Sequence, residues 1–162
     1  MDATAKAGKP VAPTSKPLAP TTMSAAEITA FLARDFPELQ GGAGAEPTFL
    51  VDAVGPMTAR MRLLYHPRHL RPGGTISGPA MFALADVGLY VAILAQLGPV
   101  ALAVTTNLNI NFLRKPEPCD LIGEARLLKL GKRLAVGEVL IFSEASEELV
   151  AHATGTYSIP SR

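Results

Sequence analysis

The feature that most constrains this chain is a long apolar segment, residues 80–95, in which Asp86 is the single charged residue. Ser77-Gly78-Pro79 comes directly before it, and Ser favours the N-cap of a helix while Pro favours its first turn. Gly98-Pro99, which follows it, is typical of a helix end. A helix that is apolar on all sides is buried, in a protein core or in a membrane. The segment therefore predicts one long buried helix.

A membrane location for this helix is disfavoured by its charge and its surroundings. Residues 79–97 approach the about 20 apolar residues that a membrane span needs. Asp86, near their middle, would cost roughly 2.5–3.5 kcal/mol at the centre of a bilayer. The flanking segments also resemble the strands of a soluble protein. We therefore expect a core helix and no membrane partner. The N-terminus has no continuous apolar stretch of the kind found in signal peptides, so we expect a cytoplasmic location.

Composition narrows the classes of function. The chain has 162 residues, which suggests one domain, and 48% of them are hydrophobic, which is enough for a substantial core. A net charge of +1 gives no reason to expect a nucleic acid partner. The single Cys119 excludes an intramolecular disulfide, and the three His residues are spread along the sequence. We therefore expect neither a metal site nor a cofactor.

The chain divides into a tail and a domain. Residues 1–22 consist largely of Ala, Thr, Lys and Pro, a composition that cannot bury enough apolar surface to order the chain. We expect residues 1–22 to be a disordered tail and residues 23–162 to form a single domain. Ser24 and Glu27 have the form of a capping box, which predicts a short helix near the start of that domain. We expect this helix to lie over the end of the core or near the mouth of a ligand site.

Six further segments have the alternating or apolar pattern of strands. They are residues 48–54, 57–65, 104–112, 121–130, 134–142 and 149–159. Residues 134–142 are apolar on both faces except for Glu138, so we expect this strand to be central. Two strands precede the long helix and four follow it, and this order excludes a doubly wound parallel sheet. The sequence predicts an α+β fold in which an antiparallel sheet wraps around one long helix.

One predicted strand carries a row of uncharged polar side chains. Simple alternation in residues 104–112 places Thr105, Asn107, Asn109 and Asn111 on one face of this strand. The opposite face then carries Thr106 and three apolar residues. An uncharged polar row suits a protein interface better than free solvent, so we expect it to mediate contact between the sheets of neighbouring dimers.

The order of elements and five short motifs resemble the hotdog fold, and within it the PaaI-like acyl-CoA thioesterases, over roughly residues 48–159. The motifs are GGTISG (73–78), LAD (84–86), NINFLR (109–114), GKRLA (131–135) and AHATGTY (151–157). The resemblance implies a homo-oligomeric enzyme that hydrolyses the thioester of a CoA-linked acyl or aryl-acyl group without a cofactor.

The resemblance also implies the catalytic residues. The family has His-Gly-Gly at the start of the central helix and a catalytic Asp seven residues after the second Gly. Ser77-Gly78-Pro79 occupies the first position here, and Asp86 the second. Asp86 is then the general base or the nucleophile, and the Gly78 N–H, at the positive end of the helix, is the oxyanion donor. Thr105 matches the Ser or Thr that often completes the site.

Candidate substrate-binding residues follow from the same comparison. Arg71 stands where the family commonly has Asn, and Ser77 stands where it has His. An Arg in this loop suits a phosphate or carboxylate of the ligand. Arg114, Lys132 and Arg133 are cations in predicted turns, at positions that can meet the CoA phosphates in this family.

The spacing of Gly78 and Asp86 predicts an oligomer. Eight residues correspond to about 12 Å along a helix axis. One thioester carbonyl cannot contact both groups within a single subunit. If both act, they belong to two chains whose helices run antiparallel across a two-fold axis, so we expect a homodimer or a homotetramer.

Two other functions are compatible with the sequence. Ser77, Pro79 and Arg71 replace the His, Gly and Asn of the family, which leaves open a non-catalytic hotdog protein that binds acyl-CoA or another acyl ligand. A hotdog dehydratase or hydratase is a third possibility, which is disfavoured because no suitable Asp/His pair is visible near the central helix.

Overall fold

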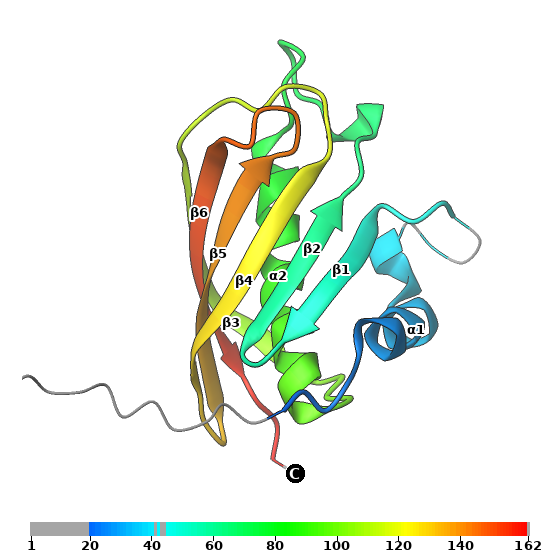
Figure 1. The fold of residues 1–162 in the computed structure, drawn as a ribbon, viewed down its shortest axis with the longest axis vertical. Helices are drawn as coiled ribbons and strands as arrows, with labels where there is room; N and C mark the ends of the chain where they lie inside the picture. The colour runs from blue at the N-terminus through cyan, green and yellow to red at the C-terminus, as the bar shows by residue number, and fades with distance from the viewer. Residues whose placement is uncertain (1–19, 41, 43–44, 162) are drawn as a thin grey trace, which may run out of the picture.

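The computed structural model describes residues 20–40, 42 and 45–161. A six-stranded antiparallel sheet wraps around the long helix α2 (Gly78–Leu97), as Figure 1 shows. The strands are β1 (Phe49–Gly55), β2 (Thr58–Leu63), β3 (Val104–Phe112), β4 (Leu121–Leu130), β5 (Leu134–Ser143) and β6 (Leu149–Ser158). Their order in the sheet is β1-β2-β4-β5-β6-β3, and every pair is antiparallel. The predicted α+β architecture is confirmed, and β5 has the predicted internal position.

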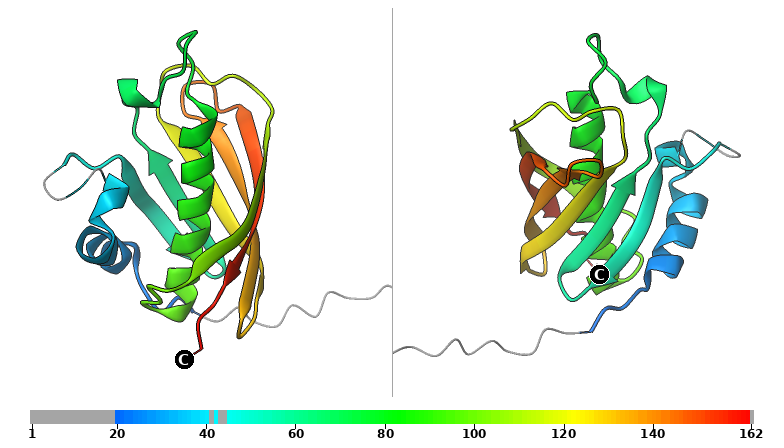
Figure 2. Two further views of the ribbon diagram at one scale, coloured as in Figure 1. Left: turned by 180° about the vertical axis from the view of Figure 1, so that it is seen from behind. Right: turned by 45° about the horizontal axis from the view of Figure 1, so that its top comes forward.

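Helix α2 begins and ends as its flanking residues predict. The Ser77 side chain accepts a hydrogen bond from the Ala80 N–H, and Gly98, with a φ of 82°, ends the helix. Thirteen of its twenty residues are buried. By length and composition α2 could cross a membrane, yet 72% of its most apolar window is buried within the fold. Its apolar surface is thus used by the core, in the hollow of the curved sheet (Figure 2, left).

The first helix, α1 (Ala25–Asp35), packs beside β1 and against α2 (Figures 1 and 2). Ser24 and Glu27 form the predicted capping box. Of the segment predicted to be a disordered tail, residues 1–19 lie outside the described residues. At its end, the Thr22 N–H donates to the Ala95 carbonyl at 2.6 Å, which fixes the entry to α1 against the last turns of α2. Short 3₁₀ helices lie at Pro37–Gln40 and Pro67–His69.

A β-bulge in β3 overturns one predicted pattern. The pairing of β3 with β6 shifts register between Thr105 and Asn107, so an extra residue interrupts the alternation. The prediction that Thr105 shares a face with Asn107, Asn109 and Asn111 is therefore wrong. The three Asn residues pair with Thr156, Thr154 and His152 of β6, on the face away from α2. Thr105 instead lies on the α2 side, where its hydroxyl donates to Asp86.

Two facing glycines allow α2 to approach the sheet closely. Gly137 of β5 and Gly155 of β6 are register partners. A Cβ built on either one would lie 2.6 Å from a methyl group of Leu89 on α2. A side chain at either position would force Leu89 to move, so the two glycines allow the close approach of helix and sheet.

We expect Gly137→Ala to destabilise the fold. The new methyl group would lie 2.6 Å from Leu89 Cδ2 and 2.8 Å from the Arg126 carbonyl oxygen, and the latter is backbone that cannot rotate away. Overpacking of this kind lowers the free energy of unfolding by about 1–3 kcal/mol. Chemical denaturation at one fixed protein concentration measures it.

Gly88→Ala is the matched control. Gly88 lies in α2, and a Cβ there would meet no atom closer than 3.5 Å. Because Ala favours helices over Gly by up to about 1 kcal/mol, this variant should be as stable as the wild type or slightly more stable. Equal destabilisation by both substitutions would contradict the role of the Gly137–Leu89 contact.

Candidate active site

Asp86 projects from the middle of α2 toward β3 and β6. Its Oδ1 accepts hydrogen bonds from the Thr105 hydroxyl, at 2.6 Å, and from the Tyr157 hydroxyl, at 2.7 Å. Among residues 20–40, 42 and 45–161, none donates to Oδ2. One oxygen of the carboxylate is therefore held in place, and the other is available for chemistry.

Tyr157 is a member of the site that the sequence patterns do not predict. Its hydroxyl lies 2.8 Å from the Asp86 carbonyl oxygen as well as 2.7 Å from Oδ1, so its proton is shared between two acceptors of the same residue. The ring is 4% exposed and stacks on Tyr90, with 6.4 Å between the centroids. The sequence does contain one sign of this role. From Ala151 onward, the residues on the inward face of β6 are Ala or Gly except for Tyr157, so Tyr157 is the residue of this face whose polar group can reach α2.

Burial changes the ionisation of the two stacked tyrosines. Desolvation raises the pKa of Tyr157 well above its usual value, and the negative charge of Asp86 raises it further. Desolvation also raises the pKa of Tyr90, with a smaller contribution from the Asp35 carboxylate. Tyr157 is therefore a neutral hydrogen-bond donor throughout the physiological pH range.

A cavity of about 420 Å³ opens beside Asp86 and is lined mainly by apolar and aromatic side chains. Its walls come from α1, α2, the segment before β3 and the start of β3, and they include Phe31, Phe36, Val87, Tyr90 and Val104. Asp35 of α1 is the one charged lining residue apart from Asp86 among those described. The first helix thus lies beside the candidate ligand site, which is the second of the two predicted positions.

The start of α2 presents a single free N–H group. Pro79 has no N–H, the Ala80 N–H donates to the Ser77 hydroxyl at 3.4 Å, and the Met81 N–H donates to the Ser77 carbonyl at 3.2 Å. No described residue accepts a hydrogen bond from the Gly78 N–H. Of the four amides that a helix start leaves unpaired, Gly78 is the one available to a ligand.

Gly78 and Asp86 border one shallow groove of about 560 Å³ on the outward side of α2. Phe82 and Phe112, which are 40% and 52% exposed, lie in the same groove. Eight residues of helix still separate Gly78 from Asp86, about 12 Å along the axis. The groove therefore contains both proposed groups, but at opposite ends.

The remaining predicted site residues lie at two ends of the molecule. Exposed Arg71 begins the turn before α2, where its N–H donates to the Thr75 carbonyl. Arg114 follows β3, and its guanidinium donates to the Leu149 carbonyl at 2.9 Å. Lys132 and Arg133 line a hollow with Leu97, at the far end of α2. The structure thus brings Asp86 and Thr105 together, places Ser77 and Gly78 with Arg71 at one end, and places Lys132 and Arg133 at the other.

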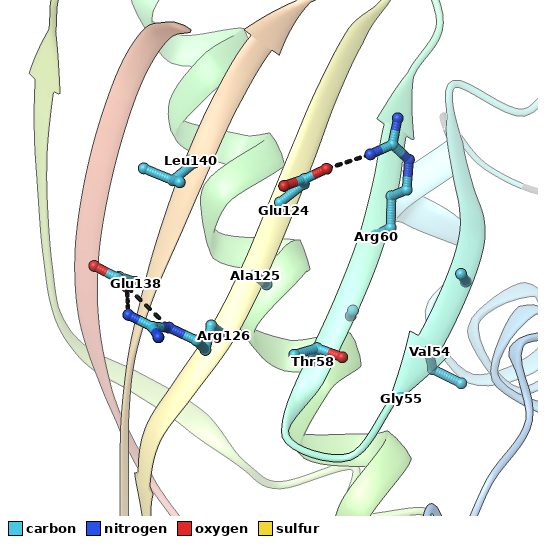
Figure 3. A pocket seen from close by; sticks show the side chains of 11 residues that line it. Val54, Gly55, Thr58, Arg60, Glu124, Ala125, Arg126, Glu138 and Leu140 are labelled. Atoms are coloured by element: carbon cyan, nitrogen blue, oxygen red, sulfur yellow. Dashed lines mark hydrogen bonds and ion pairs between the residues drawn. The ribbon is translucent and has the colours of Figure 1, made fainter.

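A larger hollow of about 600 Å³ lies on the opposite face of the sheet, as Figure 3 shows. Arg60 there is paired with Glu124, and Arg126 with Glu138. His152 also contacts Glu138 at 3.1 Å, and the bonds from Arg126 and His152 lower the pKa of that carboxyl. These charged side chains pair with one another, so the described residues that line this hollow include no unpaired charged group. Within the described residues no group of three or more His, Cys, Asp or Glu side chains is arranged to hold a metal ion.

Comparison with known proteins connects this geometry to a family. The thioesterase superfamily matches residues 73–150, from the turn before α2 into β6. The chain is 32% identical over 130 residues to a Pseudomonas aeruginosa protein named "Putative esterase PA0474", a match that covers 72% of this chain and 96% of that one. The chain belongs to the thioesterase superfamily. It is thus a thioester hydrolase, as the resemblance predicted.

Solved structures of superfamily members agree. A structure described as a putative thioesterase from Silicibacter is 52% identical, covers 86% of this chain and 94% of that one, and has a TM-score of 0.77. The phenylacetic acid degradation protein PaaI from Thermus thermophilus is 27% identical, covers 69% and 93% of the two chains, and has a TM-score of 0.61. The predicted PaaI-like hotdog fold of this thioesterase is confirmed.

The raised pKa of Tyr157 predicts how the stability of the thioesterase depends on pH. An unfolded Tyr has a pKa of about 10. A folded-state pKa above that value contributes stability that is fully present below about pH 10 and is lost as the pH rises further. The free energy of unfolding, measured with urea between about pH 9 and pH 11, should therefore fall less steeply in Tyr157→Phe than in the wild type. Parallel slopes would contradict a buried, neutral Tyr157.

Proposed function

We propose that this thioesterase hydrolyses acyl-CoA, releasing CoA and a carboxylic acid whose acyl group is alkyl or aryl. The observation that carries the proposal is Asp86, whose Oδ1 is held by two hydroxyl donors while Oδ2 accepts from no described residue and lies at the edge of an apolar cavity. PaaI, which takes part in phenylacetic acid degradation according to its name, supports an aryl-acyl group among the substrates. A cytoplasmic location belongs to the same proposal.

Asp86 has two ways to carry out the hydrolysis. As a general base, it takes a proton from water as the water oxygen attacks the thioester carbonyl carbon. As a nucleophile, Oδ2 attacks that carbon and forms an anhydride, which water then hydrolyses. Both routes break the C–S bond, release the thiol and require an ionised Asp86. In both, negative charge develops on the carbonyl oxygen, where the Gly78 N–H donates a hydrogen bond.

The cavity between α1 and α2 is the proposed acyl pocket. Its aromatic and aliphatic lining removes an apolar acyl group from water, which contributes about 25 cal/mol per Å² of buried apolar surface. Asp86 and Thr105 line this cavity together with Phe31 of α1 and Phe36, the residue that ends α1. The first helix therefore helps to define the size of the pocket.

A homodimer completes the site. Gly78 and Asp86 are too far apart in one chain to act on one carbonyl, but an antiparallel pair of α2 helices places the Gly78 of one beside the Asp86 of the other. A surface suited to this contact is present: β3 is an edge strand whose Val104 and Phe112 are exposed, and Phe82 of α2 is exposed as well. An uncovered edge strand with apolar neighbours favours association with a second chain.

A dimer of dimers would use the other face of β3. Asn107, Asn109 and Asn111 remain there as an uncharged polar row, now without Thr105. The CoA phosphates have cations within reach on both sides of the groove. Arg71 and Arg114 lie at the Gly78 end, while Lys132 and Arg133 lie near Leu97, about 16 Å along the helix axis from Asp86.

Asp86→Asn should abolish most of the activity. The amide keeps the size of the side chain but cannot accept a proton or attack as an anion, so kcat should fall by about 10²–10⁴-fold. Thiol release from a panel of alkyl-CoA and aryl-CoA thioesters, followed with a chromogenic thiol reagent, measures it. The control is Asp52→Asn, the same change at an exposed position in β1.

The outcomes of that panel separate the functions. Equal turnover by the wild type and Asp86→Asn would overturn the assignment of Asp86. Calorimetric binding of acyl-CoA with no thiol release from the wild type would favour the acyl-CoA binding function instead.

Gly78→Pro tests the oxyanion donor. Pro removes the N–H, yet it is favoured at the first helical position, and Ser77 already has the extended backbone that a following Pro requires. We expect kcat to fall by about 10²–10³-fold. Gly78→Ala retains the N–H and is the matched control; its Cβ would approach a movable ring atom of Phe112 at 3.1 Å. Equal activity in the Pro and Ala variants would exclude the Gly78 amide from catalysis.

The same variants test the shared site. Mixed Asp86→Asn and Gly78→Pro chains that exchange subunits should form heterodimers with one intact site of two. Random pairing at equal ratio gives half heterodimers, so the mixture should regain about a quarter of the wild-type activity. Light scattering checks the dimer, and proven exchange without recovered activity would argue against a site built from two chains.

A further inference from the structure

We propose that Tyr157 is a positioning residue for Asp86: together with Thr105 it holds Oδ1, so that Oδ2 alone takes part in the reaction. This inference rests on the proposed function of Asp86. It assigns a role to a residue of β6 that lies 71 positions along the chain from the carboxylate that it orients.

The geometry at Oδ1 is that of a saturated carboxylate oxygen. Two hydroxyl groups donate to it, from Thr105 at 2.6 Å and from Tyr157 at 2.7 Å. Hydroxyl donors to a carboxylate form short bonds of about 2.5–2.7 Å that are roughly twice as strong as bonds between neutral groups. With two such donors on one side, the carboxylate has one preferred rotation, and this rotation defines where Oδ2 lies.

The two donors are themselves fixed by the sheet. Thr105 and Tyr157 are register partners across β3 and β6, so they approach Asp86 from neighbouring strands. The β-bulge after Thr105 is what turns its side chain toward α2. Bulges next to active sites often have this effect of redirecting a side chain. Tyr157 is fixed further by its 4% exposure and by the stack on Tyr90.

Few other charges act on Asp86. The described residues that line its cavity and its groove include one other charged side chain, Asp35 of α1, and one other titratable group on α2, Tyr90. Arg34 is paired with Asp35 at 2.6 Å, which offsets the charge of that carboxylate. The Tyr90 hydroxyl donates to no described residue. Among the described residues, the two hydroxyl groups are therefore the direct polar contacts of the Asp86 carboxylate.

The test compares three Tyr→Phe variants, each of which removes one hydroxyl. Tyr157→Phe should lower kcat by about 10- to 100-fold, the effect of one lost hydrogen bond to a charged group, while KM changes by less than about threefold. It should also shift the acidic limb of the kcat/KM profile to higher pH, because the ionised carboxylate has lost a donor. A purely structural role for Tyr157 would not move that limb.

Tyr90→Phe and Tyr65→Phe are the comparisons. Tyr90→Phe alters the same cavity, so a change in its KM is compatible with the proposal. The acidic limb of its kcat/KM profile should stay in place, because the Tyr90 hydroxyl does not bond Asp86. Tyr65 is exposed and lies after β2, so Tyr65→Phe should change neither parameter. A Tyr157→Phe profile that matches Tyr90→Phe would overturn the proposal.

Thr105→Val provides a second route if Tyr157→Phe does not fold. Thr105 is exposed on an edge strand, so Val is tolerated there, and it removes the other donor to the same oxygen. It should shift the acidic limb in the same direction, and Thr105→Ser, which restores a hydroxyl, should reverse most of the shift. An unshifted limb in Thr105→Val would overturn the proposal.

Different results would overturn the positioning role of Tyr157 and the proposed function. An inactive wild type, or an active Asp86→Asn, overturns the acyl-CoA hydrolase mechanism itself. An active wild type with an inactive Asp86→Asn and an unshifted Tyr157→Phe overturns the positioning role alone.

Discussion

The hydrogen bonds to Oδ1 of Asp86 are the interaction on which the arrangement of α2, β3 and β6 depends. A carboxylate in an otherwise apolar helix is unfavourable unless donors stabilise it. The sheet supplies two, Thr105 from β3 and Tyr157 from β6. β3 therefore has to interrupt its alternation at a bulge, and β6 has to place its one inward polar side chain opposite Asp86. The charge of Asp86 is thus met by the bulged strand β3 and by the inward-facing Tyr157 of β6.

The remaining apolar surface of α2 sets the shape of the sheet. A helix buried on most sides needs a curved sheet, and close approach needs small residues at the contact. Gly137 and Gly155 allow this close approach, because both face Leu89 and a Cβ on either one would force the Leu89 side chain to move. The result is a rigid helix with one uncovered strip, between Gly78 and Asp86, where the candidate chemistry lies.

Much of this fold follows from local patterns. Features that depend on neighbouring residues could be predicted from the sequence. They are the caps of α2, the capping box at Ser24, and the bounds of β3 and β4. Asp86 could be identified as a candidate site residue because it is the single charged residue in an apolar segment. The bulge in β3 could not be predicted, because a prediction from periodicity takes the alternation of side chains to be constant along the strand. No residue type near Thr105 marks the position of the extra residue. Tyr157 was missed for a related reason: its bond to Asp86 is set by the register of β6 with β3, which is a property of the assembled sheet.

The residues at the start of α2 that differ from the PaaI-like pattern are compatible with thioester chemistry. Ser77, where the resembling family has His, caps the helix by accepting from the Ala80 N–H. Pro79, where that family has a second Gly, lacks an N–H but stiffens the first turn. Together they leave the Gly78 amide as the one donor at the positive end of the helix dipole for which the described part of the chain has no acceptor. In the proposed mechanism, oxyanion stabilisation is therefore concentrated on one group, the Gly78 amide, which lies in a capped and stiffened turn.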